Sequence, residues 1–141
     1  MQAQTQMAKG ELLYEIQGKT LSRTVKEITP HGVKLQMNDE GQSTGKISAN
    51  QINTVDVFMK ADGSQDWESK ALLNTRDGDM VVVSGRGTGR MASPTNGTWQ
   101  GELAFMTQSP KLAYLNTTKG WVEGSGDMAK GTYQGKVYAK K

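Results

Sequence analysis

The stretch MVVVSGRGTGRMASPTNGTWQGELAFMT, residues 80–107, decides the fold of this chain. In its first half, three valines are followed by glycine at every second position, 85, 87 and 89. A turn-forming segment, SPTNG at 93–97, comes next, and in the second half Trp99, Leu103 and Phe105 stand two or four residues apart. Alternation with a period of two on both sides of a turn is typical of a β-hairpin. The stretch therefore predicts two long antiparallel strands.

The same alternation recurs along the chain between turn signals that stand roughly ten residues apart. It predicts strands over residues 11–17, 20–28, 33–37, 52–60, 65–73, 121–128 and 132–140, and a weaker one over 42–49. Residues 18–19 leave two interpretations open, a hairpin turn or a bend within one long strand. Residues 38–41, NDEG, are expected to form a turn, because these residue types favour one.

One short segment has the features of a helix. Ser109 suits the N-cap, Pro110 suits the first helical position, and Leu112 and Leu115 form one apolar edge. We expect one short helical turn near residues 110–116. Its length suits a plug or a corner of a sheet protein.

These elements predict an all-β fold, an antiparallel meander of eight or nine strands. Closure of the meander into a barrel would protect its edge strands, and a two-sheet sandwich is the alternative. The chain has 141 residues, enough for one domain with a core. We expect a flexible N-terminus over residues 1–8, which are rich in glutamine, and a single β-barrel domain over 9–141.

Composition argues against several classes of function. The net charge is only +3 and the basic residues are scattered, so we expect no nucleic-acid binding. With no cysteine and a single histidine, His31, we expect no metal site, no cofactor and no hydrolytic triad. The sequence shows neither a signal peptide nor a long apolar run, so we expect a cytoplasmic protein with no membrane partner.

The three glycines of the first strand, at 85, 87 and 89, have a structural interpretation. A phosphate-binding glycine loop leads into a helix, and no helix follows here. Glycine on one face of a strand instead permits tight coiling or makes room for large side chains opposite. We expect Gly89 to pair with Gly101, which puts the glycines and the apolar face of the second strand inside. Arg86 and Arg90 then lie outside, whereas a slip of one residue would bring them in.

Four segments resemble the C-terminal half of the allene oxide cyclase-like barrels: residues 84–90 (SGRGTGR), 97–101 (GTWQG), 111–116 (KLAYLN) and 120–124 (GWVEG). The resemblance covers residues 64–139 and departs at Thr117, where the family has glycine. It implies an eight-stranded calycin-like barrel with a cavity for an apolar molecule, and assembly into oligomers. The plant enzymes of this family cyclise a fatty-acid epoxide in an apolar channel, with a water and a carboxylate.

The favoured hypothesis is a barrel that binds a small apolar or amphipathic molecule in its interior. The candidate ligand-binding residues are the three tryptophans, two apolar residues of the hairpin and its two arginines: Trp67, Trp99, Leu103, Phe105, Trp121, Arg86 and Arg90. One alternative is a cyclase or isomerase in which Glu123 or Glu102 is the acid-base group. The pattern leaves open whether Glu123 faces inward. The other alternative is a non-catalytic structural module that forms a homo-oligomer, a dimer or a trimer.

Overall fold

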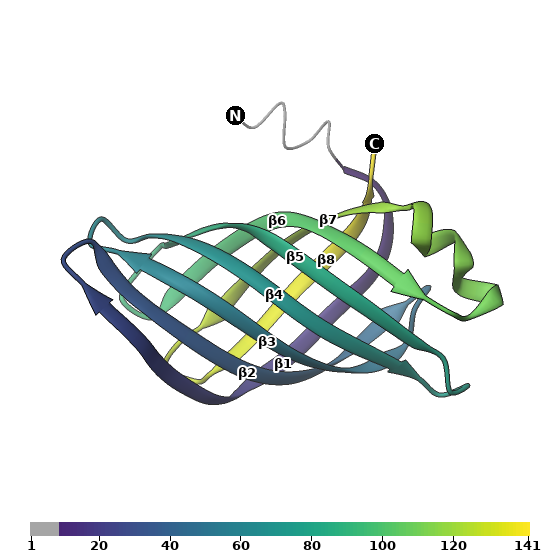
Figure 1. The fold of residues 1–141 in the computed structure, drawn as a ribbon, viewed down its shortest axis with the longest axis horizontal. Helices are drawn as coiled ribbons and strands as arrows, with labels where there is room; N and C mark the ends of the chain where they lie inside the picture. Colours follow the sequence, from purple (N-terminus) through teal and green to yellow (C-terminus); the bar gives the residue numbers. More distant parts are fainter. Residues whose placement is uncertain (1–8) are drawn as a thin grey trace.

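The computed structural model describes residues 9–141, so the flexible N-terminus expected over 1–8 lies outside the described residues. Eight strands and one short 3₁₀ helix, η1, make up the described chain (Figure 1). Their bounds are β1 Lys9–Thr29, β2 Gly32–Gly45, β3 Ala49–Lys60, β4 Ser64–Thr75, β5 Met80–Met91, β6 Asn96–Thr107, η1 Pro110–Thr117, β7 Lys119–Asp127 and β8 Thr132–Lys140.

Each strand pairs antiparallel with the next, and β8 pairs with β1, so the sheet closes into an eight-stranded barrel. The predicted all-β barrel with one short helical turn is confirmed, and the sandwich alternative is wrong. β1 runs through Gly18 without a turn, which settles the question left open at residues 18–19.

The turn expected over residues 38–41 is wrong. β2 continues through these residues and pairs with β1 on one side and β3 on the other, with Asp39 opposite Thr20 and Asn53. Ladder hydrogen bonds to two neighbouring strands outweigh the local preference of Asn, Asp and Gly for turns. The chain turns instead between Gly45, at φ +118°, and Ala49.

The pairing of β5 with β6 confirms the predicted face but not the predicted partner. Gly87 pairs with Gly101 and Gly89 with Trp99, a shift of two residues from the expected Gly89–Gly101 pair. A shift by an even number leaves every side chain on the same face of the sheet. The apolar face of the hairpin therefore faces the interior, and Arg86 lies on the outer face beside Glu102, its cross-strand partner.

Glycines on the inner face provide room for the rings of neighbouring strands. A Cβ at Gly124 would stand 2.2 Å from two atoms of the Trp99 ring, and one at Gly135 would stand 2.9 Å from the same ring. A Cβ at Gly101 would lie 2.6 Å from the Trp67 ring. These three glycines thus have the second role considered for glycine, space for large side chains. At Gly87, in the strand for which the roles were considered, a Cβ would instead meet the backbone oxygen of Gln100 at 2.0 Å.

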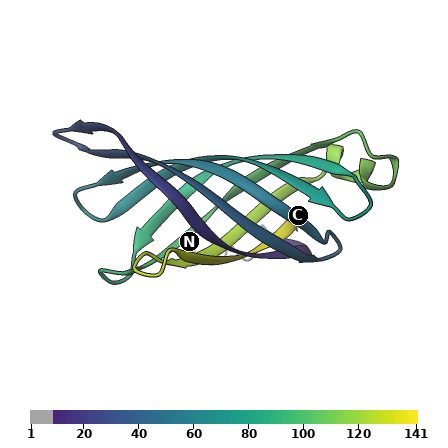
Figure 2. The same cartoon turned by 90° about the horizontal axis from the view of Figure 1, so that it is seen from below.

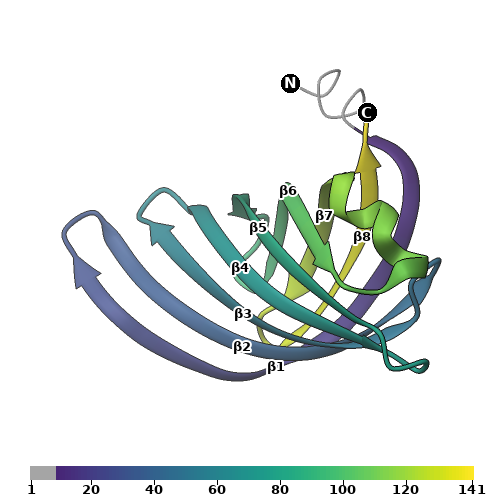
Figure 3. The ribbon, with the colours of Figure 1, turned by 45° about the vertical axis from the view of Figure 1, so that its right-hand side comes forward.

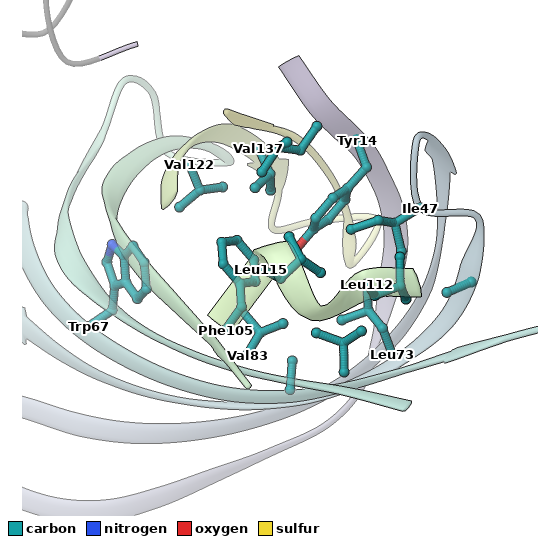
Figure 4. Packing of buried hydrophobic residues seen from close by; sticks show 14 of the residues in the cluster. Tyr14, Ile47, Trp67, Leu73, Val83, Phe105, Leu112, Leu115, Val122 and Val137 are labelled. Carbon is teal, nitrogen blue, oxygen red and sulfur yellow. The ribbon is translucent and has the colours of Figure 1, made fainter. Parts of the chain in front are cut away.

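One end of the barrel is closed by η1. Leu112 and Leu115 of this helix are buried, and in Figure 4 they lie among Tyr14 and Leu73 from the barrel wall and Ile47 from the β2–β3 turn. Thr107 at the end of β6 is linked to the helix, because its N–H and C=O pair with the amide side chain of Asn116 at 2.8 and 3.0 Å. The plug is thereby joined to the sheet by both packing and hydrogen bonds.

The opposite end is open. β1 pairs with β8 only as far as Lys19, and beyond that residue it pairs with β2 alone. The far part of the β1–β2 hairpin consequently curves away from β7 and β8 (Figure 3) and extends past the other strands (Figure 2). Side chains at this end, among them Arg23, Met91 and Met128, border the interior space, so the interior is reached from here.

Candidate functional site

A cavity of about 190 Å³ occupies the barrel between the core at the plugged end and the open end. A single water molecule needs about 10–15 Å³ of such space, so the cavity has room for a small organic molecule. Its wall is mostly apolar and includes side chains from β2, β3, β4 and β6: Met37, Val55, Val57, Met59, Trp67, Trp99 and Leu103. A mostly apolar concave wall with a few polar groups is typical of small-molecule sites.

Two of the three predicted tryptophans form part of this wall. The rings of Trp67 and Trp99 meet edge to face, with centroids 6.3 Å apart and planes at 80°. The Trp67 Nε1 donates a hydrogen bond to the carbonyl of Thr88 at 3.1 Å, which fixes the ring against the wall. Leu103 also lines the cavity, whereas Phe105 lies deeper, in the buried core.

Trp121 lies on the outer face, so the expectation that all three tryptophans occupy interior positions is wrong. On β7 the inward positions belong to Val122 and the glycines around it, because rings from β6 already fill the space there: Phe105 over Gly120 and Trp99 over Gly124. The Trp121 Nε1 donates instead to Glu123 Oε2 at 3.1 Å on the outside.

The two candidate acid-base residues are also on the outer face. Glu123 accepts a hydrogen bond from Lys9 Nζ at 3.1 Å, and both side chains are about one third exposed. Glu102 is exposed, and its hydrogen bond with Lys140 lowers its pKa. Both carboxylates therefore lie outside the cavity, and the lowered pKa of Glu102 keeps it ionised. Arg86 and Arg90 share the outer face with them, as the favoured register predicted, so neither of these candidate ligand-binding residues lines the cavity.

A polar cluster that the sequence interpretation missed lies inside the cavity. Asp39 accepts hydrogen bonds from the Tyr133 hydroxyl, at 2.7 Å to Oδ1, and from Asn53 Nδ2, at 3.0 Å to Oδ2. Gln51 Nε2 lies 3.5 Å from the Tyr133 hydroxyl and completes the cluster. All four residues line the cavity. They come from β2, β3 and β8, which only barrel closure brings together.

Burial determines the electrostatics of this cluster. Asp39 is 7% exposed, and the loss of solvent raises its pKa against the lowering effect of its two hydrogen bonds. Burial and the nearby Asp39 also raise the pKa of the Tyr133 phenol. Within residues 9–141 no lysine or arginine forms an ion pair with Asp39. The carboxyl group is thus held by neutral donors alone.

A simple signal could have found Asp39. In the predicted strand over 33–37, Val33, Leu35 and Met37 alternate with polar residues, and Asp39 continues the same alternation. The turn composition of residues 38–41 masked it. Tyr133 likewise shares its inward face with Gly135 and Val137 on β8.

The described residues contain no cluster of three or more histidine, aspartate or glutamate side chains suited to a metal ion. In the same part of the chain, no helix has the length and apolar character needed to cross a membrane.

No protein-family model matches the sequence, and no curated protein matches it. Solved structures share the fold. A protein of unknown function from Clostridium acetobutylicum has a TM-score of 0.81 at 13% identity, over 93% of this chain and 97% of that one. A β-barrel-like protein from Acinetobacter baumannii has a TM-score of 0.80 at 17% identity, over 93% and 94%. An enzyme from Penicillium herquei has a TM-score of 0.68 at 17% identity, over 93% and 95%.

At these identities the likeness concerns the fold alone. The neighbours support a β-barrel, and they are not specific to the allene oxide cyclase-like family that the sequence resembles.

Proposed function

We propose that this barrel binds a small apolar or amphipathic molecule in its interior. The observation that carries the proposal is the cavity of about 190 Å³, closed by η1 at one end and open at the other. A solid core would have filled this space with side chains, as happens around Leu115. An apolar wall with Trp67 and Trp99 favours entry of an apolar group from water.

The expected affinity follows from the area that such a ligand would bury. A chain of eight carbons such as n-octanol gains about 0.8 kcal/mol for each methylene group that leaves water, about 6 kcal/mol in all, before the cost of immobilisation. We therefore expect a Kd for n-octanol in the range from roughly tens of micromolar to one millimolar.

Isothermal titration calorimetry of the full chain with n-octanol tests the proposal. Val55 lines the cavity, so Val55→Phe should reduce the affinity at least ten-fold by filling it. Ile52 lies on the same strand but is 56% exposed on the outer face, so Ile52→Phe is the matched control and should leave the affinity unchanged. Binding of n-octanol that Val55→Phe leaves intact would refute the proposal, as would failure of the unmodified protein to bind n-octanol or a charged eight-carbon analogue.

A cyclase or isomerase is the second candidate, and one observation favours it. Asp39 and the Tyr133 hydroxyl form a buried pair inside an apolar cavity, and burial raises the pKa of both groups. Such a pair can hold or donate a proton to a bound substrate. This candidate needs Asp39 as its acid-base group in place of Glu102 and Glu123. Turnover of a bound compound that Asp39→Asn abolishes would support it.

The association of copies into a dimer or a trimer stays a prediction, and light scattering of the purified chain tests it.

A further inference from the structure

The polar cluster of the cavity has more hydrogen-bond acceptors than donors. Asp39 carries two acceptor oxygens, and within residues 9–141 no group donates a hydrogen bond to the buried Oδ1 of Asn53. A buried acceptor without a donor is unfavourable, so proteins rarely leave one unpaired. Both residues line the cavity, and a bound group can supply the missing donor once the Asn53 amide turns toward it.

The cluster also lacks a positive charge. Neutral side chains supply both hydrogen bonds to Asp39, and among residues 9–141 Arg23 is the only cationic side chain in the cavity wall. Arg23 is exposed near the open end, and no ion pair joins it to Asp39 within the described residues. Burying a carboxylate with no cation nearby is unfavourable, and a bound cation would relieve this cost.

A group that meets both needs carries a positive charge and several N–H donors. A protonated primary amine has three such donors and can bond Asp39 and Asn53 together. The rest of the wall, with Trp67, Trp99 and Met59, contacts apolar carbon. These features describe an amine with an apolar tail.

We propose that the cavity binds a small amphipathic amine, whose ammonium group donates hydrogen bonds to Asp39 and to Asn53 Oδ1 while its apolar tail lies against Trp67 and Trp99. The inference rests on the proposed function and specifies the chemical class of its ligand. A carboxylate ligand would have the opposite placement, with its charged group at Arg23 by the open end.

Three probes of equal chain length separate these cases: n-octylamine, n-octanol and n-octanoate, each titrated calorimetrically into the full chain at pH 7 below its micellar concentration. An alkylamine is protonated at this pH, as lysine is. We expect n-octylamine to bind at least ten-fold more tightly than n-octanol, since hydrogen bonds to a charged group are the stronger ones. We expect n-octanoate to bind more weakly than n-octanol.

Asp39→Asn keeps the size of the side chain, and the Asn53 amide can rotate to pair with it. This variant should bind the amine and the alcohol with affinities within about three-fold of each other, since only the charge has changed. Glu40→Gln is the matched control, because Glu40 is the next residue on β2 and lies exposed on the outer face, paired with Lys19. It should keep the full preference for the amine.

Each outcome decides between the proposals. Equal or tighter binding of n-octanol or n-octanoate to the unmodified protein overturns the amine proposal and leaves the proposed function standing. A preference for the amine that persists in Asp39→Asn also overturns it, because the cation would then bind elsewhere. Failure of all three probes to bind overturns both. The comparison of probes on the unmodified protein stands even if a variant does not fold.

Discussion

The contact of Trp99 with Gly124 predicts that one added methyl group destabilises the barrel and narrows its cavity. A Cβ at position 124 would stand 2.2 Å from the Cζ2 and Cη2 atoms of the indole and 2.7 Å from the carbonyl oxygen of Gln134. Ordinary van der Waals contact begins at 3.4 Å, so in Gly124→Ala the ring must move by roughly 1 Å toward the cavity.

Overpacking of this kind costs about 1–3 kcal/mol. For a domain of this size, 1 kcal/mol lowers Tm by roughly 3–4 °C, so the expected decrease for Gly124→Ala is about 3–12 °C in a thermal melt followed by circular dichroism. The affinity for n-octanol should fall as well, because Trp99 lines the cavity.

Gly126→Ala is the matched control. Gly126 lies on the same strand and the same face, and neither glycine has a positive φ. A Cβ at Gly126 would approach Thr132 O to 3.3 Å and the Tyr133 Cβ to 3.7 Å, so this variant should stay within about 0.5 kcal/mol of the unmodified protein.

A double-mutant cycle completes the test of this contact. Trp99→Leu removes the ring, so it should cancel at least about 1 kcal/mol of the cost of Gly124→Ala. Equal Tm values for Gly124→Ala and Gly126→Ala would contradict this prediction. So would additive free-energy changes for Trp99→Leu and Gly124→Ala, because the position of the indole would then not depend on Gly124.

Three further predictions concern the cluster and the plug. Burial raises the pKa of Asp39 in the folded protein. The contribution of Asp39 to the free energy of unfolding is therefore fully present below its unfolded-state pKa of about 3.9, and it is lost as pH rises through its pKa in the folded protein. Urea unfolding from pH 3 to 7 should show that the stability of Asp39→Asn relative to the unmodified protein increases with pH; a constant difference would contradict this. Asn116→Ala should cost about 1–3 kcal/mol, since it leaves the N–H and C=O of Thr107 unpaired, and Asn116→Asp, which keeps the acceptor, should cost less in the same denaturation assay. Leu115→Ala should cost about 2–5 kcal/mol because Leu115 is fully buried, whereas Tyr114→Ala, on the exposed side of η1, should cost less than about 1 kcal/mol; equal losses would show that the plug does not depend on Leu115.

For the β5–β6 hairpin, the local sequence pattern predicted both the strands and the face that lies inside. Its alternation predicted both strands, and the apolar face of Trp99 and Leu103 predicted which side is inside. The predicted pairing was wrong by two residues, but the predicted inner face was right, because side chains alternate with a period of two. Turn chemistry similarly predicted η1 from Ser109 and Pro110.

The local sequence pattern could not predict which side chains of β7 point into the barrel. Trp121 is the largest side chain of its strand, and hydrophobicity alone would turn it inward. Its neighbours on β6 already send the rings of Trp99 and Phe105 over Gly124 and Gly120, so no room for another indole exists there. Which strand supplies the ring and which supplies the glycine depends on residues that are distant in sequence.

By itself, the sequence determined the antiparallel meander, the short helical turn and the inner face of the β5–β6 hairpin, because each follows from periodicity and turn residues within a few positions. It favoured closure into a barrel over a sandwich, and the pairing of β8 with β1 decided between them. The tertiary structure alone decided the candidate site. Asp39, Asn53 and Tyr133 stand on three different strands, and Asp39 lies in a segment whose composition favours a turn. Only ladder pairing on both sides of β2 keeps that segment extended, and only the closed barrel removes Asp39 from water and faces it with Tyr133.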